Sequence, residues 1–466
     1  MDAQTRQILE WSGEPERAAH DFKSFNERYR EATGQAFDLE PVNAKRLLTI
    51  FGNSHFLTHF LIENPLEADL LVASPAIETD KKLGDFQEEI QEILGDSSHS
   101  HEEFGRRLRL YKYREYLRLT VKDLSQAANL QPVLGEISDL AIAILQSALN
   151  FLMEEMQKEW GIPLLQEEGA AESRPCGFCV IAMGKLGGRE LNYSSDVDLQ
   201  YVYQSDSGGI GGLRPISNHE FFVKLSERLT RLLSQKSGDG FLYRVDLNLR
   251  PEGASGTLAN SLSALEKYYE TFGQEWERQA LLKAVPVAGD AKLAKDFKAL
   301  IDPFVWRKSL TLQVVDKMKE MKRKVHDSAA KRSTRGFHVK LDEGGIREIE
   351  FFVQTLQLLY GGTHPQIRTP NTLNALDAVA GAKLIQPTEA QQLKDAYLFL
   401  RRVEHRLQLV NEAQTHLLPD KTQEQKAVAR RMGYFEDDPE KARERFMDDL
   451  TRYTALVKSI FKNLFE

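Results

Sequence analysis

The sequence predicts an α+β protein that is mostly α-helical, with a small mixed sheet flanked by N-terminal helices and a C-terminal helical bundle. Apolar residues recur at three- and four-residue spacing from the start to about Asp123, and again from Ser261 onward. Between these stretches, from Cys176, the period changes to the alternation of half-buried strands. The chain has 466 residues, more than one hydrophobic core usually serves. We therefore expect three domains, at residues 1–125, 126–290 and 291–466.

The N-terminal region is expected to be helical because of two amphipathic stretches, KRLLTIFGNSHFLTHFLIENPLEADLL and FGRRLRLYKYREYLRLTVKDL. The acidic and polar segment from Asp80 to His101 is expected to be a surface helix end and a loop. A long apolar helix is predicted over ISDLAIAILQSALNFLMEEMQKEW, and it should stop at Gly161. The Gly/Ala/Ser/Pro-containing stretch from Gln166 to Pro175 is then a linker or loop.

The small sheet is predicted from three segments and one helix. FCVIAM is a short apolar run of strand character, and VDLQYVY alternates as a half-buried strand does. A helix over NHEFFVKLSERLTRLLSQ, capped by Asn218, follows. FLYRVDLNLRP predicts a further strand whose two faces alternate, with Val245, Leu247 and Leu249 on one side and Arg244, Asp246, Asn248 and Arg250 on the other.

Helical patterns return after Ser261 and continue to the end of the chain. The predicted helices cover LEKYYETFGQEWERQALLKA, LTLQVVDKMKEMKRKVHD, IREIEFFVQTLQLLYGG, DAVAGAKLIQ and EAQQLKDAYLFLRRVEHRLQLV. A final helix should begin at Asp438-Pro439, because proline is favoured in a first helical turn. No fixed-period repeat is present.

Composition and charge exclude several classes of protein. The net charge of −8 gives no general attraction to nucleic acid. The sequence contains no run of about 18 apolar residues that would predict a membrane span. Its polar, acidic N-terminus does not resemble a signal peptide. We therefore expect a cytoplasmic protein with no nucleic acid or membrane partner.

The two cysteines, Cys176 and Cys179, cannot form a disulfide framework for a chain of this size. Their CGFC spacing could belong to a redox pair or to half of a zinc site. However, no second Cys/His pair stands at ligand spacing, and the segment runs directly into an apolar strand.

The sharpest chemical signal is Ser194-Ser195-Asp196-Val197-Asp198, which follows Gly184-Lys185-Leu186-Gly187-Gly188. Residues two apart on a strand share a face, so Asp196 and Asp198 should present two carboxylates side by side. Asp246 supplies a third carboxylate from a neighbouring strand. Hard oxygen ligands of this kind suit Mg²⁺, and three carboxylates could hold one or two ions for displacement at phosphorus.

The glycine-rich loop and nearby cations suggest phosphate binding. Backbone N–H groups of such a loop, with Lys185 and Arg250, would hold phosphate oxygens. GKLGG lacks the spacing and the terminal Lys-Ser/Thr of a Walker loop, which disfavours P-loop chemistry.

These motifs carry a family resemblance. GKLGGRELNYSSDVDL resembles the G-S-x-D-x-D core of the nucleotidyltransferase superfamily that includes DNA polymerase β. The longer match is similar to one half of the glutamine synthetase adenylyltransferase/adenylyl-removing enzyme, through IAMGKLGGRELNYSSDVDL, RVDLNLRPEGASG with YYETFGQEWERQALLKA, KLDEGGIREIEFFVQ and the weaker YREYLRLTVKDL. The resemblance extends over nearly the whole chain. Much of the superfamily has glycine where this chain has Ser194.

That enzyme is a tandem of two similar halves, and GRELNYSSD and GGIREIEF resemble its N-terminal, adenylyl-removing half. The chain is then expected to be an excised half or a split protein. The resemblance implies a polymerase β-like catalytic domain over residues 126–290. It also implies removal of AMP from an adenylylated tyrosine of glutamine synthetase by Mg²⁺-dependent phosphorolysis, with release of ADP.

The roles that follow from this resemblance can be assigned residue by residue. Asp196, Asp198 and Asp246 are the expected catalytic metal ligands. The nucleotide- or phosphate-binding residues are expected to be Gly184, Lys185, Gly187, Ser194, Ser195, Arg250, Arg278 and Lys283. Arg278 or Lys283 would support the charge of the transition state. The implied partners are adenylylated glutamine synthetase, inorganic phosphate with ADP or ATP, and the PII signalling protein in its uridylylated form.

Alternatives remain open at several positions. Glu277 and Arg278 could be a surface pair on an amphipathic helix. Glu348 and Glu350 face different ways on a helix, and a buried pair of Glu348 with Arg401 or Arg402 is the simpler interpretation. The eleven histidines show no metal-ligand spacing, and His405 is expected at a helix surface or in packing.

Two other functions remain open beside deadenylylation. One is adenylyl transfer from ATP to the same tyrosine. The other is a catalytically silent regulatory module of the same fold, which the three clustered carboxylates disfavour.

Overall fold

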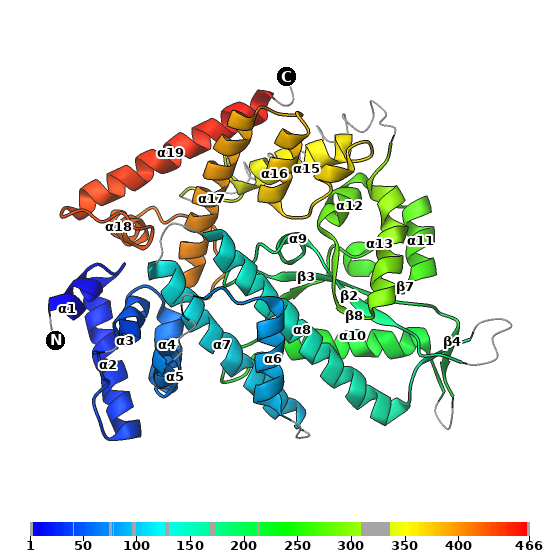
Figure 1. Ribbon diagram of the computed structural model, residues 1–466, viewed down its shortest axis with the longest axis horizontal. Helices are drawn as coiled ribbons and strands as arrows, with labels where there is room; N and C mark the ends of the chain where they lie inside the picture. The colour runs from blue at the N-terminus through cyan, green and yellow to red at the C-terminus, as the bar shows by residue number, and fades with distance from the viewer. Residues whose placement is uncertain are drawn as a thin grey trace.

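The computed structural model describes residues 3–40, 42–73, 77, 79–95, 99–125, 130–166, 173–211, 215–308 and 336–463. The helix expected over LTLQVVDKMKEMKRKVHD lies outside these residues, as does most of the linker expected between Gln166 and Pro175. The described part is mostly helical with small mixed sheets, which confirms the predicted α+β class (Figure 1).

Helices form the N-terminal third of the chain, coloured blue to cyan in Figure 1. They are α1 (Ala3–Glu10), α2 (Pro15–Thr33), α3 (Val42–Leu47), the 3₁₀ turn η1 (Leu48–Ile50), α4 (His55–Glu63), α5 (Glu67–Ala73), α6 (Leu83–Leu94), α7 (His101–Ser125) and α8 (Leu130–Trp160). The segment from Asp80 to His101, expected to be a surface helix end and a loop, contains the whole helix α6. Its Phe86 and Ile90 are buried where α6 packs on α8, and this packing stabilises a helix that the acidic sequence alone does not indicate.

Helix α8 is the one helix of the described chain that is long and apolar enough to cross a membrane by length and composition. Its most apolar stretch is 78% buried inside the molecule, as in a central core helix. Glycine follows the helix at position 161, as predicted.

Two small sheets lie in the middle of the chain. Their strands are β1 (Leu164–Leu165), β2 (Phe178–Ala182), β3 (Val197–Tyr203), β4 (Gly208–Ile210), β5 (Ile216–Ser217), β6 (Val245–Asp246), β7 (Ala259–Ser261) and β8 (Val285–Gly289). The larger sheet has the order β6-β3-β2-β8, and β7 also pairs with β3. Strand β3 is antiparallel to β2 and parallel to β6 and β7, so the sheet is mixed as predicted.

The strand expected over FLYRVDLNLRP is far shorter than predicted. Only Val245 and Asp246 pair with β3, and the chain then turns, with the N–H of Arg250 bonded to the carbonyl of Leu247. The register places Asp246 beside Asp198 on the parallel neighbour. The short strands β7 and β8 were not predicted, because they directly adjoin strongly helical sequences.

Helix α10 (Asn218–Ser234) covers the sheet and follows the predicted span closely. Its cap is Ser217, whose hydroxyl accepts the N–H of Glu220, so the prediction of Asn218 as the cap is wrong. The Asn218 amide instead donates to the carbonyls of Leu164, Ser205 and Ser207. Asn218 therefore joins α10 to strand β1 and to the loop that contains Ser205 and Ser207.

The remaining helices lie beside and beyond the sheet. They are α9 (Gly184–Gly187), α11 (Leu262–Thr271), α12 (Glu275–Ala280), α13 (Ala291–Val305), α15 (Ile346–Tyr360), α16 (Thr372–Gly381), α17 (Pro387–Leu409), α18 (Thr422–Arg431) and α19 (Pro439–Asn463), with the 3₁₀ turns η3 (Gly253–Ser255), η4 (Leu281–Lys283) and η5 (Pro365–Ile367). The predicted starts of α15 and α19 are confirmed. Helix α16 begins five residues before the predicted Asp377, and α13 and α18 were not predicted.

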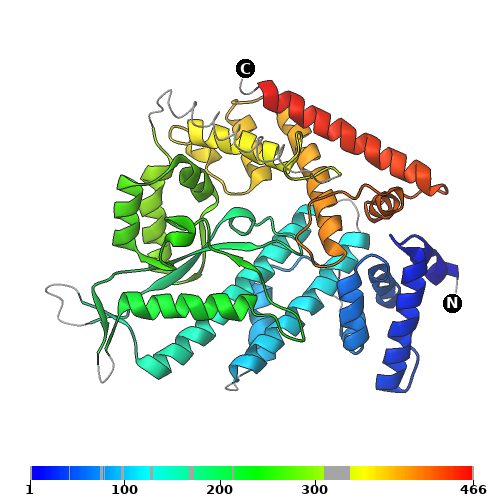
Figure 2. The ribbon, with the colours of Figure 1, turned by 180° about the vertical axis from the view of Figure 1, so that it is seen from behind.

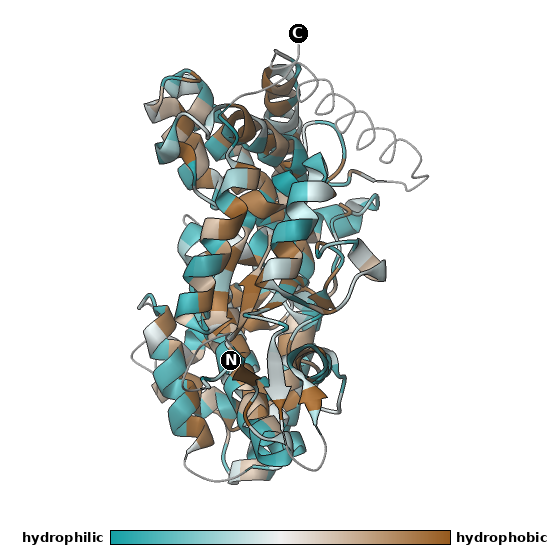
Figure 3. Ribbon diagram, turned by 90° about the vertical axis from the view of Figure 1, so that its right-hand side faces the viewer, coloured by the Kyte–Doolittle hydropathy of each residue, from teal (hydrophilic) through white to brown (hydrophobic). Residues whose placement is uncertain are grey.

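The sheet is buried on both faces. Along β2, Phe178 and Val180 belong to a core shared with the N-terminal helices and α10. Cys179 and Ile181, on the opposite face, belong to a core formed with α11 and α13. Most helices in Figure 3 are banded teal and brown, which is the colouring of amphipathic helices with one buried side.

The C-terminal helices α15 to α19 form a third core and pack against the sheet region at one end. In Figures 1 and 2 the orange, C-terminal half of α17 extends from this bundle toward the sheet. A buried ion pair also connects α17 to α7, because the Arg406 guanidinium donates to the Asp123 carboxylate at 2.9 Å. His405 lies fully buried beside them, so it is a packing residue and not a surface one.

We predict that Arg406→Met lowers the free energy of unfolding by about 3 kcal/mol, because the buried carboxylate of Asp123 would lose its main compensating charge. Urea denaturation followed by circular dichroism measures this. The matched control is Arg28→Met, which removes an exposed pair with Glu31 on α2 and should cost less than about 1 kcal/mol. Equal losses in the two variants would contradict this account of the α7–α17 contact.

Candidate active site

The three predicted carboxylates line one cavity. Asp198 lies in β3, Asp246 lies in the adjacent β6, and Asp196 immediately precedes β3. The cavity has a volume of about 260 Å³, and its lining residues are Gly184, Lys185, Ser195, Asp196, Asp198, Asp246, Lys283, Lys340, Glu350, Gln354, Gln408, Gln414 and His416. The sheet therefore brings together carboxylates that are about 50 residues apart in the sequence.

Gly184 begins α9 and determines how closely the loop approaches the carboxylates. Its φ of +52° lies in the left-handed region, and a Cβ atom there would lie 2.3 Å from Oδ2 of Asp198. A larger residue would displace either the loop or the carboxylate. The backbone at the start of α9 can thus lie directly beside Asp198.

The carboxylates have different surroundings. Asp196 accepts hydrogen bonds from Arg244 at 2.7 Å and from Gln414 at 2.8 Å. Asp246 accepts the backbone N–H of Asn248 at 2.7 Å. Burial, and after it the neighbouring carboxylate of Asp246, raise the pKa of Asp198 to about 6. The cavity therefore has an excess of negative charge where Asp198 and Asp246 meet.

A divalent cation is compatible with this donor set. Carboxylate oxygens are the ligands that Mg²⁺ prefers, and a cation would relieve the repulsion that raises the pKa of Asp198. Among the described residues, no group of three or more His, Cys, Asp or Glu side chains already converges in a metal-binding arrangement. Because Arg244 and Gln414 hold Asp196, that side chain would have to change partners to share an ion with the other two.

Two of the predicted lysines also line the cavity, each backed by a buried glutamate. Nζ of Lys185 lies 2.8 Å from Glu404, in α17. Nζ of Lys283 lies 2.6 Å from Glu190 and 3.1 Å from the hydroxyl of Thr372. Burial lowers the pKa of Lys185 to about 8, against the opposing effect of Glu404.

Glu404 is completely buried and joins α17 to the sheet region. Its carboxylate also accepts the side-chain amide of Asn192 at 2.6 Å, and it lies 3.0 Å from Nε of Arg401 and 2.7 Å from Nδ1 of His416. Burial alone would raise the pKa of Glu404, but Lys185, Arg401 and His416 outweigh that effect and hold the pKa well below its ordinary value. Glu404 is thus an ionised group inside the protein.

Nearly half of the cavity lining comes from residues after position 335, which the sequence prediction did not assign to the site. These residues are Lys340, Glu350, Gln354, Gln408, Gln414 and His416. The KLDEGGIREIEFFVQ motif contained a usable signal for the first three, because it belongs to the family resemblance. Gln408, Gln414 and His416 carry no such signal, since only the packing of α17 brings them to the sheet.

Glu348 was expected to pair with Arg401 or Arg402, and the structure contradicts the pairing with Arg401. Arg401 pairs with Glu404, whereas Glu348 accepts the N–H of Gly344 at 2.9 Å before the start of α15. Glu350 faces the cavity, 3.9 Å from Lys283. The two glutamates do face different ways, as their spacing indicates.

Four predicted site residues do not line the cavity. Arg250 donates to the carbonyls of Leu247, Ala254 and Gly256, so it supports its own loop. Arg278 is fully buried and donates to the carbonyls of Val305 and Leu358, which also excludes the surface pair considered for Glu277 and Arg278. The sequence does not reveal which backbone carbonyls these arginines bind, so their structural role could not be predicted.

The other two are Gly187 and Ser194. A Cβ at Gly187 would lie 1.8 Å from the carbonyl oxygen of Lys283, so this glycine permits close packing of α9 on η4. Ser194 is buried, and its hydroxyl donates to the carbonyl of Glu412 at 2.7 Å. Both residues stabilise the segments that carry the site without lining the cavity.

Cys176 and Cys179 are free and buried in the structure. Burial raises the pKa of both thiols. This environment favours inert packing residues over a redox pair.

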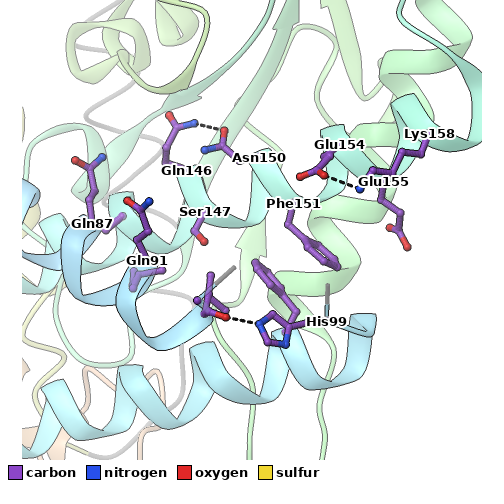
Figure 4. Close-up of a pocket in the computed structure, with 15 residues that line it drawn as sticks. Gln87, Gln91, His99, Gln146, Ser147, Asn150, Phe151, Glu154, Glu155 and Lys158 are labelled. Carbon is purple, nitrogen blue, oxygen red and sulfur yellow. Dashed lines mark hydrogen bonds and ion pairs between the residues drawn. The ribbon is translucent and has the colours of Figure 1, made fainter. Parts of the chain in front are cut away.

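A second, larger cavity of about 810 Å³ lies between α6 and α8 (Figure 4). Amides such as Gln91 and Asn150, together with Phe151, line it. Of its two carboxylates, Glu154 and Glu155, the first is paired with Lys158 at 2.6 Å. This cavity lacks the motif carboxylates of the smaller cavity, where Asp198 and Asp246 lie side by side on neighbouring strands. The smaller cavity is therefore the candidate active site.

Comparison with known families places this chain in a class of enzyme. The glutamate-ammonia ligase adenylyltransferase family matches residues 44–300, more than half of the chain and all of its described strands. The GlnD PII-uridylyltransferase family matches residues 313–465. The class is that of nucleotidyltransferase-type enzymes.

The chain belongs to the glutamate-ammonia ligase adenylyltransferase family. Curated relatives named bifunctional glutamine synthetase adenylyltransferase/adenylyl-removing enzyme confirm the resemblance found in the motifs. The one from Xanthobacter autotrophicus is 41% identical over 79% of this chain and 37% of its own length. Those from Thioalkalivibrio sulfidiphilus and Burkholderia mallei are each 36% identical, over 90% and 88% of this chain and 42% and 44% of their own lengths. The chain thus spans about two fifths of these relatives.

We predict that Asp198→Asn is more stable than the wild type at pH 8 in metal-free buffer, by about 2 kcal/mol, and that the two converge toward pH 4. The carboxyl pKa is about 4 when unfolded and about 6 when folded. As pH rises between these values, the unfolded chain loses its proton first, so the wild type loses stability and the amide variant does not.

Denaturant titrations with EDTA at several pH values measure this difference. Addition of Mg²⁺ at pH 8 should narrow it, because a cation favours the ionised carboxylate. A difference that stays constant from pH 4 to pH 8 would contradict the assigned environment of Asp198.

Proposed function

We propose that this chain removes AMP from an adenylylated tyrosine of glutamine synthetase by phosphorolysis and releases ADP. The observation that carries the proposal is the cavity in which Asp196, Asp198 and Asp246 meet Lys185 and Lys283. Carboxylates for cations and lysines for phosphate oxygens are what displacement at phosphorus requires. The names of the relatives include an adenylyl-removing activity.

We further propose that residues around this cavity form a polymerase β-like nucleotidyltransferase core. The order of the parts supports this: a glycine loop after β2, two carboxylates at the start of β3, and a third carboxylate on the parallel strand β6. The family resemblance of GKLGGRELNYSSDVDL implies the same core.

The reaction balances without a strong base. An oxygen of hydrogen phosphate forms a bond to the AMP phosphorus, and the bond from that phosphorus to the tyrosine oxygen breaks. The proton of hydrogen phosphate ends on the tyrosine oxygen, which gives ADP and the free tyrosine. Because phosphate is already anionic at neutral pH, the site has to align the groups and balance their charge.

Asp196, Asp198 and Asp246 are the residues that would hold Mg²⁺. When bound, it would neutralise negative charge on the phosphoryl oxygens. Lys185 and Lys283 lie on the same cavity and would contact phosphate oxygens, with Glu404 and Glu190 fixing their positions. Ser195 and the backbone beginning at Gly184 complete that side of the cavity.

Removal is favoured over transfer by the GGIREIEF segment, which resembles the adenylyl-removing half. In this segment Gly344 has a φ of +77°, and a Cβ there would lie 2.2 Å from the carbonyl oxygen of Thr454. The glycine permits α15 to start against α19, from where Glu350 reaches the cavity. The segment that resembles the adenylyl-removing half therefore also contributes a residue to the cavity.

The proposed partners are adenylylated glutamine synthetase and a PII signalling protein in its uridylylated form. The match of residues 313–465 to a PII-uridylyltransferase family supports the second, since that family is named for its action on PII.

The test uses this chain with AMP-modified glutamine synthetase, Mg²⁺ and inorganic phosphate, and follows ADP by chromatography. A parallel reaction contains unmodified synthetase and ATP. We expect ADP only when phosphate is present. AMP incorporation in the parallel reaction would identify the transferring activity instead, and no product in either would favour the regulatory module.

We predict that Asp196→Ala reduces ADP formation by at least about a hundredfold, because it removes one of the three charges that would hold the cation. The circular dichroism spectrum and melting temperature should stay close to those of the wild type. The matched control is Asp296→Ala on α13, whose carboxylate pairs with Lys292 outside the cavity. Full activity in the Asp196 variant would refute the assigned site.

A further inference from the structure

The three lysines of the cavity differ in how their charge is balanced. Lys185 pairs with Glu404, whose side chain is 0% exposed, and Lys283 pairs with Glu190, whose side chain is 3% exposed. Each of these lysines therefore has an anionic partner that water does not screen. Their positive charge is already largely balanced before any substrate enters.

Lys340 is the exception. It lines the same cavity, but within the described parts of the chain its ammonium group forms no hydrogen bond or ion pair. Its charge still acts across the cavity, since it is among the cations that lower the pKa of Glu350 against the opposing effect of burial. Lys340 thus presents a cation to the cavity that none of the described side chains neutralises by contact.

The backbone around Lys340 is held in place on both sides. Its own carbonyl accepts the N–H of Arg347 at 3.0 Å, and the carbonyl of Val339 accepts the N–H of Ile346 at 3.0 Å. The N–H of Val339 in turn donates to the carbonyl of His416 at 2.9 Å. The lysine therefore projects from a segment that is fixed against the start of α15 and the loop after α17.

We propose that Lys340 binds the inorganic phosphate that attacks the AMP phosphorus. This inference rests on the proposed phosphorolysis and adds the residue that receives its second substrate. Phosphate is an oxyanion with two negative charges near neutral pH, and it must approach a cavity that contains four carboxylates. An uncommitted lysine supplies a charge-assisted hydrogen bond at the point where the other two lysines are already paired.

The origin of Lys340 in the chain agrees with this role. The adenylyltransferase family match ends at residue 300, whereas Lys340 lies in the segment that packs with the C-terminal bundle. The sheet would thus hold the adenylyl group, and the bundle side would hold the phosphate that removes it. Lys340 aligns the phosphate and takes no proton in this account.

The test compares Lys340→Met, Lys340→Arg and the control Lys295→Met, an exposed lysine on α13. ADP formation from AMP-modified glutamine synthetase is measured over a range of phosphate concentrations. We expect Lys340→Met to raise the KM for phosphate by about tenfold to a hundredfold, with an unchanged KM for the modified synthetase. Lys340→Arg should recover most of the loss, and the control should match the wild type.

Calorimetric titration of the same proteins with inorganic phosphate in the presence of Mg²⁺ gives a readout that needs no turnover. Weaker phosphate binding by Lys340→Met, with retained binding by Lys340→Arg, supports the inference even if no ADP forms, in which case the proposed reaction alone fails. An unchanged phosphate affinity, or an unchanged KM for phosphate in an active Lys340→Met enzyme, overturns the inference.

Discussion

The arrangement of the site depends on one buried carboxylate, that of Glu404. A fully buried ionised group is very costly unless its charge is compensated, so the groups around it are held in place. Lys185 and Asn192 come from the sheet region, and Arg401 and His416 come from α17 and the loop after it. This carboxylate therefore holds α17 and the loop after it against the sheet region.

The consequence is a cavity lined by charged residues from both the sheet region and the C-terminal bundle. The sheet side carries Asp196, Asp198 and Asp246, and the parallel register of β3 and β6 places Asp198 beside Asp246. The bundle side carries Lys340 and, beside it, Glu350. Because the sheet is packed on both faces, the carboxylates cannot easily move apart to relieve their mutual repulsion. A bound cation would relieve it, so the site favours cation binding.

The sequence permits prediction of what depends on local spacing. Asp196 and Asp198 share a short motif, and Asp246 follows a recognisable apolar pattern, so all three could be assigned to one site. Gln408, Gln414 and His416 could not, because only the packing of α17 and the loop after it brings them there. Arg250 and Arg278 were expected to be site residues, but the guanidinium groups of both donate to backbone carbonyls elsewhere. The general fold followed from periodicity, while β7, β8 and α6 depend on contacts that no single segment reveals.

Glu404 couples the C-terminal bundle to α9 through Lys185. A double-mutant cycle tests it most directly, with Lys185→Met, Glu404→Gln and the combined variant compared with the wild type by denaturant unfolding. The account predicts a coupling free energy of about 1–3 kcal/mol between the two substitutions, because each removes the same buried contact. Additive losses, with a coupling near zero, would contradict it.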